Sequence, residues 1–66
     1  MKIRVNGQER EISEGKILSD FLEDNGYKRE RIAVELNGEI APKTSYEKTV
    51  LQDGDVLEVV SFVGGG

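Results

Sequence analysis

The segment at positions 53–63 reads DGDVLEVVSFV, and it decides how the rest of the sequence is interpreted. Its first three residues, Asp53-Gly54-Asp55, have the composition of a turn. Residues 56–63 form the most apolar stretch of the chain, and both of their alternating sets are rich in apolar side chains. Because both sets are apolar, we expect a strand at 56–63 in the centre of the sheet, with a helix across one of its faces.

The two faces of this expected strand differ by one carboxylate. Burying an unpaired carboxylate is costly, so the set that contains Glu58 should point away from the core, and Leu57 and Val59 should point into it. Val60 and Phe62 then lie on the outer face, where two exposed apolar residues indicate a partner site that also includes Glu58. The alternative is that a loop covers Val60 and Phe62, and low exposure of both would exclude docking.

The first 13 residues indicate a hairpin. Apolar residues at positions 1, 3 and 5 alternate with polar ones, as in a strand with one buried face. Asn6-Gly7 is a favoured pair for a type I′ turn, because both central positions of that turn need positive φ. The returning segment 8–13 is polar except for Ile12, which is typical of a solvated edge strand.

A helix is predicted next, from apolar residues at positions 17, 18, 21 and 22 with acidic residues between them. Its start has no good cap, because Lys16 is a poor N-cap residue. Its end is clearer: Asn25-Gly26 provides a residue for the left-handed conformation, and Tyr27 can fold back onto the last turn.

A charged connector follows the helix. Lys28, Arg29 and Arg31 form a small basic cluster with Glu30 inside it. A solvated loop is the simpler interpretation of this cluster, and docking to an acidic partner is the alternative.

A second hairpin and a short turn complete the chain before the last strand. Alternation at 32–36 predicts a strand, and Asn37-Gly38 predicts a second hairpin turn after it. The segment 39–41 is predicted to be a short returning strand, which ends at Pro42 because proline cannot donate a hydrogen bond to a ladder. Thr44 and Glu47 stand three apart, as in a capping box for a short helical turn around Tyr46.

The element order is therefore strand, strand, helix, strand, strand, short turn, strand. This order and length predict an α+β fold of the ubiquitin-like β-grasp type, with a mixed sheet of four to five strands and one main helix packed across one face. We expect a single domain over 1–63 and a flexible glycine tail at 64–66. Sixty-six residues without a disulfide can build only a marginal core, so nearly every apolar residue should be structural.

Composition excludes several classes of function. The chain has no Cys and no His, so it lacks a disulfide, a thiolate nucleophile, a sulfur-ligated metal and the commonest general base. Nine basic against 13 acidic residues give a net charge of −4, which argues against nucleic-acid binding. No apolar run approaches the roughly 20 residues of a membrane span, and the charged N-terminus is unlike a signal peptide. We expect a cytoplasmic protein.

The carboxylates show no acid/base or metal-binding motif. We interpret the 13 Asp and Glu side chains as a solvated acidic surface, and we predict no catalytic residue and no metal site.

The glycines at 64–66 are the remaining candidate site. They add no side chain to pack and cost the most entropy to order, so they cannot serve to stabilise the last strand. They are narrow and unbranched, and they can present a carboxylate roughly 10 Å beyond the fold at about 3.3–3.6 Å per residue. A partner enzyme could admit such a thread through a channel too tight for any residue with a Cβ. The alternative is a frayed end without function.

Several features together resemble the ThiS family, the small sulfur carriers of thiamine biosynthesis. These are the element order, the Leu36-Asn37-Gly38-Glu39-Ile40 hairpin, the Gln52-Asp53-Gly54-Asp55 turn, the apolar last strand and the Gly-Gly end. The resemblance covers essentially the whole chain. The small subunit of molybdopterin synthase shares the fold and the tail, but this hairpin and turn look more like the thiamine carrier.

The resemblance implies a mechanism in which the chain is a co-substrate and not an enzyme. An E1-like adenylyltransferase would use ATP to convert the Gly66 carboxylate into an acyl-adenylate, and the chain itself would bind no cofactor. A sulfur donor, ultimately a cysteine desulfurase, would displace AMP and leave a thiocarboxylate for thiazole synthase. Gly65 matches the penultimate glycine of the family, Gly64 extends the thread, and Val60 and Phe62 match positions that expose apolar groups to the activating enzyme.

Two other functions remain open at this point. The carrier could feed molybdopterin or another sulfur pathway, or be conjugated to lysines as a ubiquitin-like modifier. Alternatively, the chain is a non-covalent binding module whose glycine end is dispensable. We expect a monomer when free, and the thread mechanism predicts that residues 64–66 are poorly ordered in it.

Overall fold

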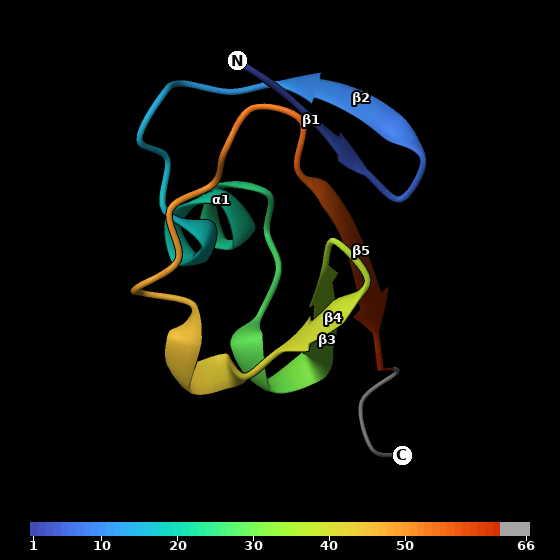
Figure 1. Cartoon of the computed structure of the whole chain (residues 1–66). Coiled ribbons are helices and arrows are strands. Elements are labelled where there is room, and N and C mark those ends of the chain that lie inside the picture. The colour runs from blue at the N-terminus through green and yellow to red at the C-terminus, as the bar shows by residue number, and fades with distance from the viewer. Residues whose placement is uncertain (63–66) are drawn as a thin grey trace.

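Five strands form one mixed sheet in the order β2-β1-β5-β3-β4, in a computed structural model that describes residues 1–62 (Figure 1). β1 and β5 are parallel, and the other neighbouring strands are antiparallel. The central position of the last strand is thus confirmed. The strands are β1 (Lys2–Val5), β2 (Gln8–Glu11), β3 (Ile32–Leu36), β4 (Glu39–Ala41) and β5 (Val56–Ser61).

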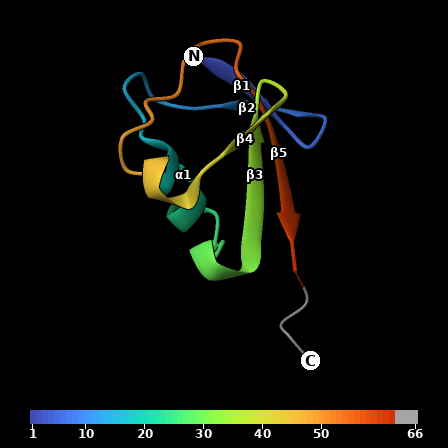
Figure 2. The same cartoon turned by 60° about the horizontal axis from the view of Figure 1, so that its bottom comes forward.

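One α-helix, α1 (Leu18–Asp24), packs on one face of this sheet, and the segment that leads into β5 passes beside it (Figures 1 and 2). Two 3-10 turns, η1 (Arg29–Arg31) and η2 (Lys43–Ser45), lie on the connections around β3 and β4. The predicted tail at 64–66, together with Val63, lies outside the described residues. No helix in the described part of the chain has the length and apolar character that a membrane span requires.

The core lies between the sheet and α1. Leu57 and Val59 of β5 are 0% and 7% exposed, which confirms the predicted inward face. Burial of this apolar area supplies the main favourable free energy of folding. The other buried apolar side chains come from β1, β3, α1 and the segment before β5: Ile3, Val5, Ile32, Val34, Leu18, Phe21, Leu22, Tyr46 and Leu51.

Both predicted hairpin turns are present. Asn6 and Gly7 have φ of 50° and 83°, and Asn37 and Gly38 have φ of 52° and 86°. Positive φ at both central positions is the requirement of a type I′ turn. β2 is an edge strand, as expected, and all four of its residues are exposed.

Helix α1 begins without a side-chain cap, as predicted, because its N-terminus is capped by the chain segment before β5. The N-cap residue Ile17 makes no side-chain cap hydrogen bond. Instead, the amide of Leu18 donates to the carbonyl of Thr49 at 2.8 Å, and the amide of Ser19 donates to the carbonyl of Tyr46 at 3.0 Å. Tertiary contacts therefore satisfy two of the N–H groups that a helix start leaves open.

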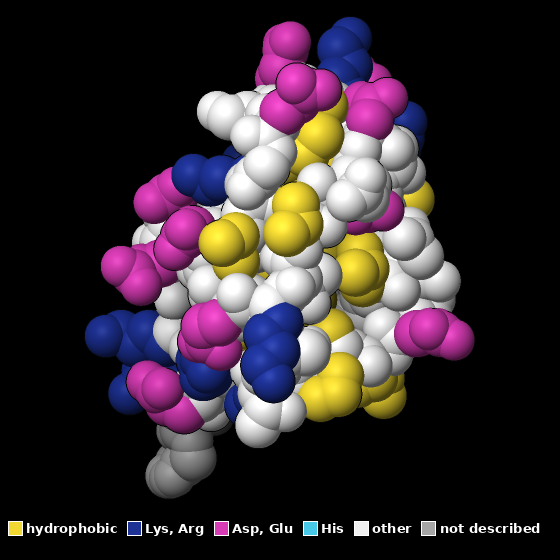
Figure 3. Space-filling view, turned by 60° about the vertical axis from the view of Figure 1, so that its left-hand side comes forward, with side chains coloured by type: hydrophobic (Ala, Val, Ile, Leu, Met, Phe, Trp, Pro, Cys, Tyr) yellow, Lys and Arg dark blue, Asp and Glu magenta, His cyan; other side chains and the backbone are white. Residues whose placement is uncertain are grey.

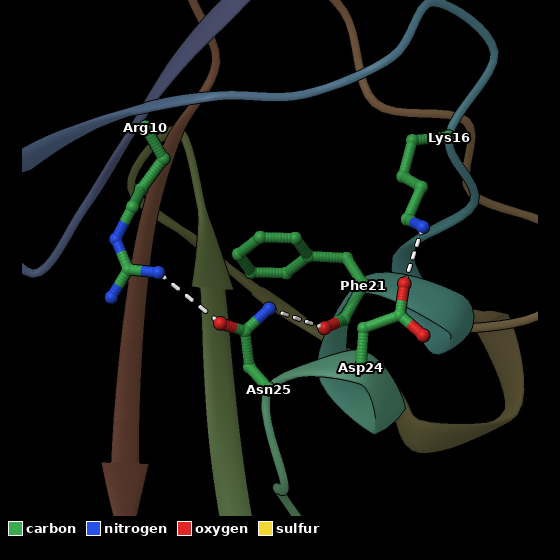
Figure 4. Close-up of polar contacts among 5 residues, drawn as sticks. All are labelled: Arg10, Lys16, Phe21, Asp24 and Asn25. Carbon is green, nitrogen blue, oxygen red and sulfur yellow. Dashed lines mark hydrogen bonds and ion pairs between the residues drawn. The ribbon is translucent and has the colours of Figure 1, made fainter.

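The end of α1 has the hydrogen bonds of a Schellman motif. The amide of Tyr27 donates to the carbonyl of Leu22 at 2.9 Å, and that of Gly26, at φ 80°, donates to Glu23 at 3.0 Å. Arg10 of the edge strand then reaches across to the same helix end and donates to the Asn25 side chain at 3.1 Å (Figure 4). A cation near a helix C-terminus is favourable, so this contact ties β2 to α1.

The predicted capping box at Thr44 and Glu47 is wrong. Pro42 is the N-cap of η2, its φ of −61° suits a helix start, and Thr44 lies inside the turn. The Pro42 carbonyl accepts the amide of Ser45 at 2.9 Å, which sets the turn earlier in the chain than the box would. Glu47 instead forms an ion pair with Arg29.

Asp55 also departs from the prediction of a solvated acidic surface. It is 9% exposed, and its carboxylate accepts the amide of Gln52 at 2.7 Å and the side-chain amide of Asn37 at 3.0 Å. The other turn carboxylate, Asp53, is exposed and accepts the amide of Lys2 at 2.8 Å. The turn is thus present, but one of its carboxylates has a structural role.

Replacing the buried carboxylate should destabilise the fold more than replacing its exposed neighbour. Asp55→Ala leaves two part-buried hydrogen-bond donors, the Gln52 amide and the Asn37 side-chain amide, without their acceptor, which should lower the free energy of unfolding by about 2 kcal/mol. Asp53→Ala removes one exposed hydrogen bond and should cost below about 1 kcal/mol. Urea unfolding of both variants measures the difference, and equal losses would contradict the structural role of Asp55.

The hydroxyl of Tyr46 should be replaceable without loss. It is buried and has no hydrogen-bond partner among the described residues, and burial raises the pKa of the phenol above its ordinary value of 10.0. Tyr46→Phe should therefore keep or raise the free energy of unfolding at neutral pH. Because the unfolded phenol ionises first, stability of the parent falls as pH rises above 10, and the advantage of Tyr46→Phe should grow there. A constant difference across that range of pH would contradict this.

Candidate functional site

The outer face of β5 carries exposed apolar side chains around one carboxylate. Val56 and Val60 are 41% and 57% exposed, and Phe62, just beyond the strand, is 53% exposed. Glu58 lies between the two valines on the same face and is also exposed. The exposure of Val60 and Phe62 excludes the alternative in which a loop of the described residues covers them, whereas docking of a partner there stays a prediction.

Ile40 extends this apolar surface, and sequence reasoning missed it. At 75% it is more exposed than any other large apolar residue in the described part of the chain. It pairs with Glu35 across the hairpin, and Glu35 pairs with Glu58. Since directly opposed residues share a face, Ile40 lies on the outer face with Val60. The two-residue turn at Asn37-Gly38 fixes this register, so the signal was available in the sequence.

Two carboxylates face each other within this surface. Glu35 and Glu58 are a directly opposed cross-strand pair, and no ion pair with either is found among residues 1–62. Like charges in this arrangement destabilise a sheet. The outer face therefore suits a partner that offers apolar contacts together with a cation or hydrogen-bond donors.

A second view of the molecule shows a mixed surface. Figure 3, which brings the left-hand side of Figure 1 forward, shows separate small groups of apolar side chains with acidic and basic side chains around and between them. Of the exposed large apolar residues in the described range, Val50, at 46%, is the one that lies neither on the outer face of β5 and its neighbours nor at the end of β5. Apolar exposure is thus concentrated around β5, its neighbour strands and Phe62.

Two asparagine side chains hold β5 from its two neighbours. Asn6, in the turn after β1, accepts the amide of Val59 at 2.8 Å and donates to the Val59 carbonyl at 3.2 Å. Asn37, in the turn after β3, accepts the amide of Val56 at 2.9 Å, and its side-chain amide donates to Asp55. Each asparagine side chain thereby bonds to the backbone of β5 as a residue of a neighbouring strand would. These hydrogen bonds fix the position of β5, whose outer face carries the exposed apolar residues.

A groove lies where β5 ends. It has a volume of about 410 Å³, and its lining includes Tyr27, Lys28, Arg31, Ile32 and Phe62. The amide of Phe62 donates to the carbonyl of Arg31 at 2.6 Å, which joins the last described residue to η1. The groove therefore adjoins the point where the sequence continues into Val63 and the glycines.

The basic cluster predicted at 28–31 is divided by the structure. Arg29 is bound within the fold: it pairs with Glu47, and its guanidinium carbon lies 5.4 Å from the centre of the Tyr46 ring. Lys28 and Arg31 instead line the groove and form no ion pair with a described residue. The cluster in the sequence thus consists of one residue with a structural role, Arg29, and two cations that can contact a partner, Lys28 and Arg31.

No group of three or more His, Cys, Asp or Glu side chains that could hold a metal ion is found among residues 1–62. The predicted reacting residue, Gly66, and the thread residues Gly64 and Gly65 lie outside the described residues, so their roles remain predictions.

Comparison with known proteins places the chain in a family. A family model described as the ThiS family matches residues 3–66. The chain is 40% identical over 62 residues to the sulfur carrier protein ThiS of Thermus thermophilus, with 94% of this chain and 95% of that protein covered. It is 44% identical over 66 residues to a thiazole synthase of Paramagnetospirillum magneticum, but this match spans only 20% of that protein's length.

A solved structure supports the same conclusion and confirms the predicted α+β fold. The crystal structure of the thiamine biosynthesis protein (ThiS) from Geobacter metallireducens matches with a TM-score of 0.84 and 32% identity, and all of both chains is covered. Because the family model and the relatives agree over nearly the full sequence, this chain belongs to the ThiS family of sulfur carrier proteins.

Proposed function

We propose that this chain carries sulfur for thiazole formation in thiamine biosynthesis, as a thiocarboxylate on Gly66. The observation that carries the proposal is the ThiS family match over residues 3–66, which includes the three glycines. ThiS sulfur carrier proteins are not enzymes. The chain contributes the reacting carboxylate and the surface that positions it.

The chemistry requires activation, because a carboxylate is a poor electrophile. An adenylyltransferase joins the Gly66 carboxylate oxygen to the α-phosphorus of ATP and releases pyrophosphate, so that the acyl carbon gains AMP as a leaving group. A persulfide sulfur, which we expect to come ultimately from a cysteine desulfurase in the cytoplasm, then attacks the acyl carbon, and AMP departs to leave an acyl disulfide. A thiol reductant cleaves the S–S bond of this acyl disulfide, which releases the Gly66 thiocarboxylate and leaves a disulfide between the thiol and the donor. Hydrosulfide gives the same thiocarboxylate in one step without a reductant. No step uses a side chain of this protein, which accords with its lack of Cys and His.

Thiazole synthase is the acceptor that we propose. Relatives named thiazole synthase from Paramagnetospirillum magneticum and Magnetococcus marinus contain a segment similar to all of this chain within a protein of about five times its length. A carrier segment joined to an enzyme acts at high effective concentration. The same two activities acting as separate proteins would need a docking surface, and the outer face of β5 offers one.

The central test is the intact mass after incubation with the adenylyltransferase, ATP and sulfide. We expect a mass increase that corresponds to exchange of one oxygen for sulfur, located at the C-terminus by fragmentation. A chain that lacks Gly65 and Gly66 should show no exchange under the same conditions. Exchange in the truncated chain, or none in the full chain, would overturn the proposal. Transfer of the sulfur to product by thiazole synthase then distinguishes thiamine biosynthesis from other sulfur pathways.

The docking role of Val60 predicts a second outcome. Val60→Glu places a charge in an apolar contact, where it must be desolvated, and should raise the KM of the adenylyltransferase for this chain about tenfold or more. Val50→Glu makes the same change at a valine of similar exposure, 46% against 57%, away from this face. It should leave KM unchanged. Equal effects of the two substitutions would contradict docking through the outer face, and urea midpoints of both show that they are folded.

A further inference from the structure

The groove at the end of β5 has a chemical character that differs from the rest of the molecule. The chain as a whole carries a net charge of −4. Yet the described residues that line the groove include Lys28 and Arg31 and no Asp or Glu. Glu30 belongs to the same 3-10 turn but does not contribute to the lining. The groove is thus a local cationic site on an acidic protein.

The groove also has an apolar component. Tyr27 is half-buried, and Phe62 is 53% exposed, so an aromatic side chain stands open beside the two cations. Aromatic and Arg side chains are enriched in protein interfaces. A bound segment that is complementary to these residues has carboxylates for the two cations and an apolar side chain for the two aromatic rings.

The position of the groove indicates which protein supplies that occupant. The amide of Phe62 is hydrogen-bonded to the carbonyl of Arg31, so the groove is fixed to the last described residue of the chain. The residues that follow are those that the proposed function delivers to an enzyme. In the proposed function the adenylyltransferase is the first enzyme to receive them, so we take its surface as the one that meets the groove beside Phe62.

We propose that this groove binds an acidic segment of the adenylyltransferase, with Lys28 and Arg31 as the residues that recognise its carboxylates. This inference rests on the proposed function and adds a specificity determinant to it. Complementary charge at the edge of an interface raises the rate of productive encounter and fixes orientation. Lys28 and Arg31 act in this proposal as positioning residues, because their role is to hold the enzyme.

The test measures kinetics of the adenylyltransferase with charge-reversed forms of this chain. Lys28→Glu and Arg31→Glu should each raise the KM for the chain about five- to tenfold at low salt and leave kcat unchanged. The difference from the parent should shrink as added salt screens the charges. Lys28→Arg keeps the charge and should retain the parent KM.

A matched control makes the same change in net charge at a residue outside the groove. Lys48 is exposed and does not line the groove, so Lys48→Glu should leave KM within about twofold of the parent. An equal rise in the KM for the chain in Lys48→Glu and Lys28→Glu would show a general effect of net charge and would overturn the groove assignment. A rise in the KM for ATP alone would assign the two cations to the nucleotide and overturn it as well.

The outcomes separate this inference from the proposed function. If the parent chain is thiocarboxylated and the charge-reversed variants keep its KM, the groove assignment fails and the carrier function stands. If the parent chain is not a substrate, both fail together.

Discussion

The rest of the structure depends on the hydrogen bonds that hold β5 in place from the strands and turns on both sides of it. This strand lies at the centre of the sheet, parallel to β1 and antiparallel to β3. Its backbone is held by ladder bonds and also by the side chains of Asn6 and Asn37, the two turn asparagines. Both asparagines adopt positive φ, which asparagine tolerates better than most residues. One residue type thus closes each hairpin and secures the strand between them.

The functional surfaces follow from this constraint. Because Leu57 and Val59 fill the core under α1, the alternate residues of β5 must face outward, and the cross-strand register adds Ile40 to them. The same strand ends at Ser61, where the amide of Phe62 donates to the carbonyl of Arg31. The apolar outer face and the cationic groove therefore flank the point from which the glycines continue in sequence.

Much of this arrangement could be predicted from local patterns. Period-2 alternation, the Asn-Gly pairs and the helical spacing each depend on residues a few positions apart, and the structure confirms the strands, turns and helix that they indicate. The capping box failed because Pro42 set the start of η2 and Glu47 was paired with Arg29, a residue 18 positions away. The role of Asp55 was missed in part for the same reason, since one of its two partners, Asn37, is 18 positions away.

The sequence by itself determined the element order and the inward face of β5, because alternation and the cost of burying Glu58 are local properties. Whether a loop covers Val60 and Phe62 was decided by the tertiary structure, which leaves both exposed. Only the tertiary structure decided which polar groups meet. It capped α1 with the carbonyls of Tyr46 and Thr49, and it separated Arg29 from Lys28 and Arg31. The physical reason is that a hydrogen bond or ion pair requires a distance of a few ångströms, and chain spacing does not set that distance between remote residues.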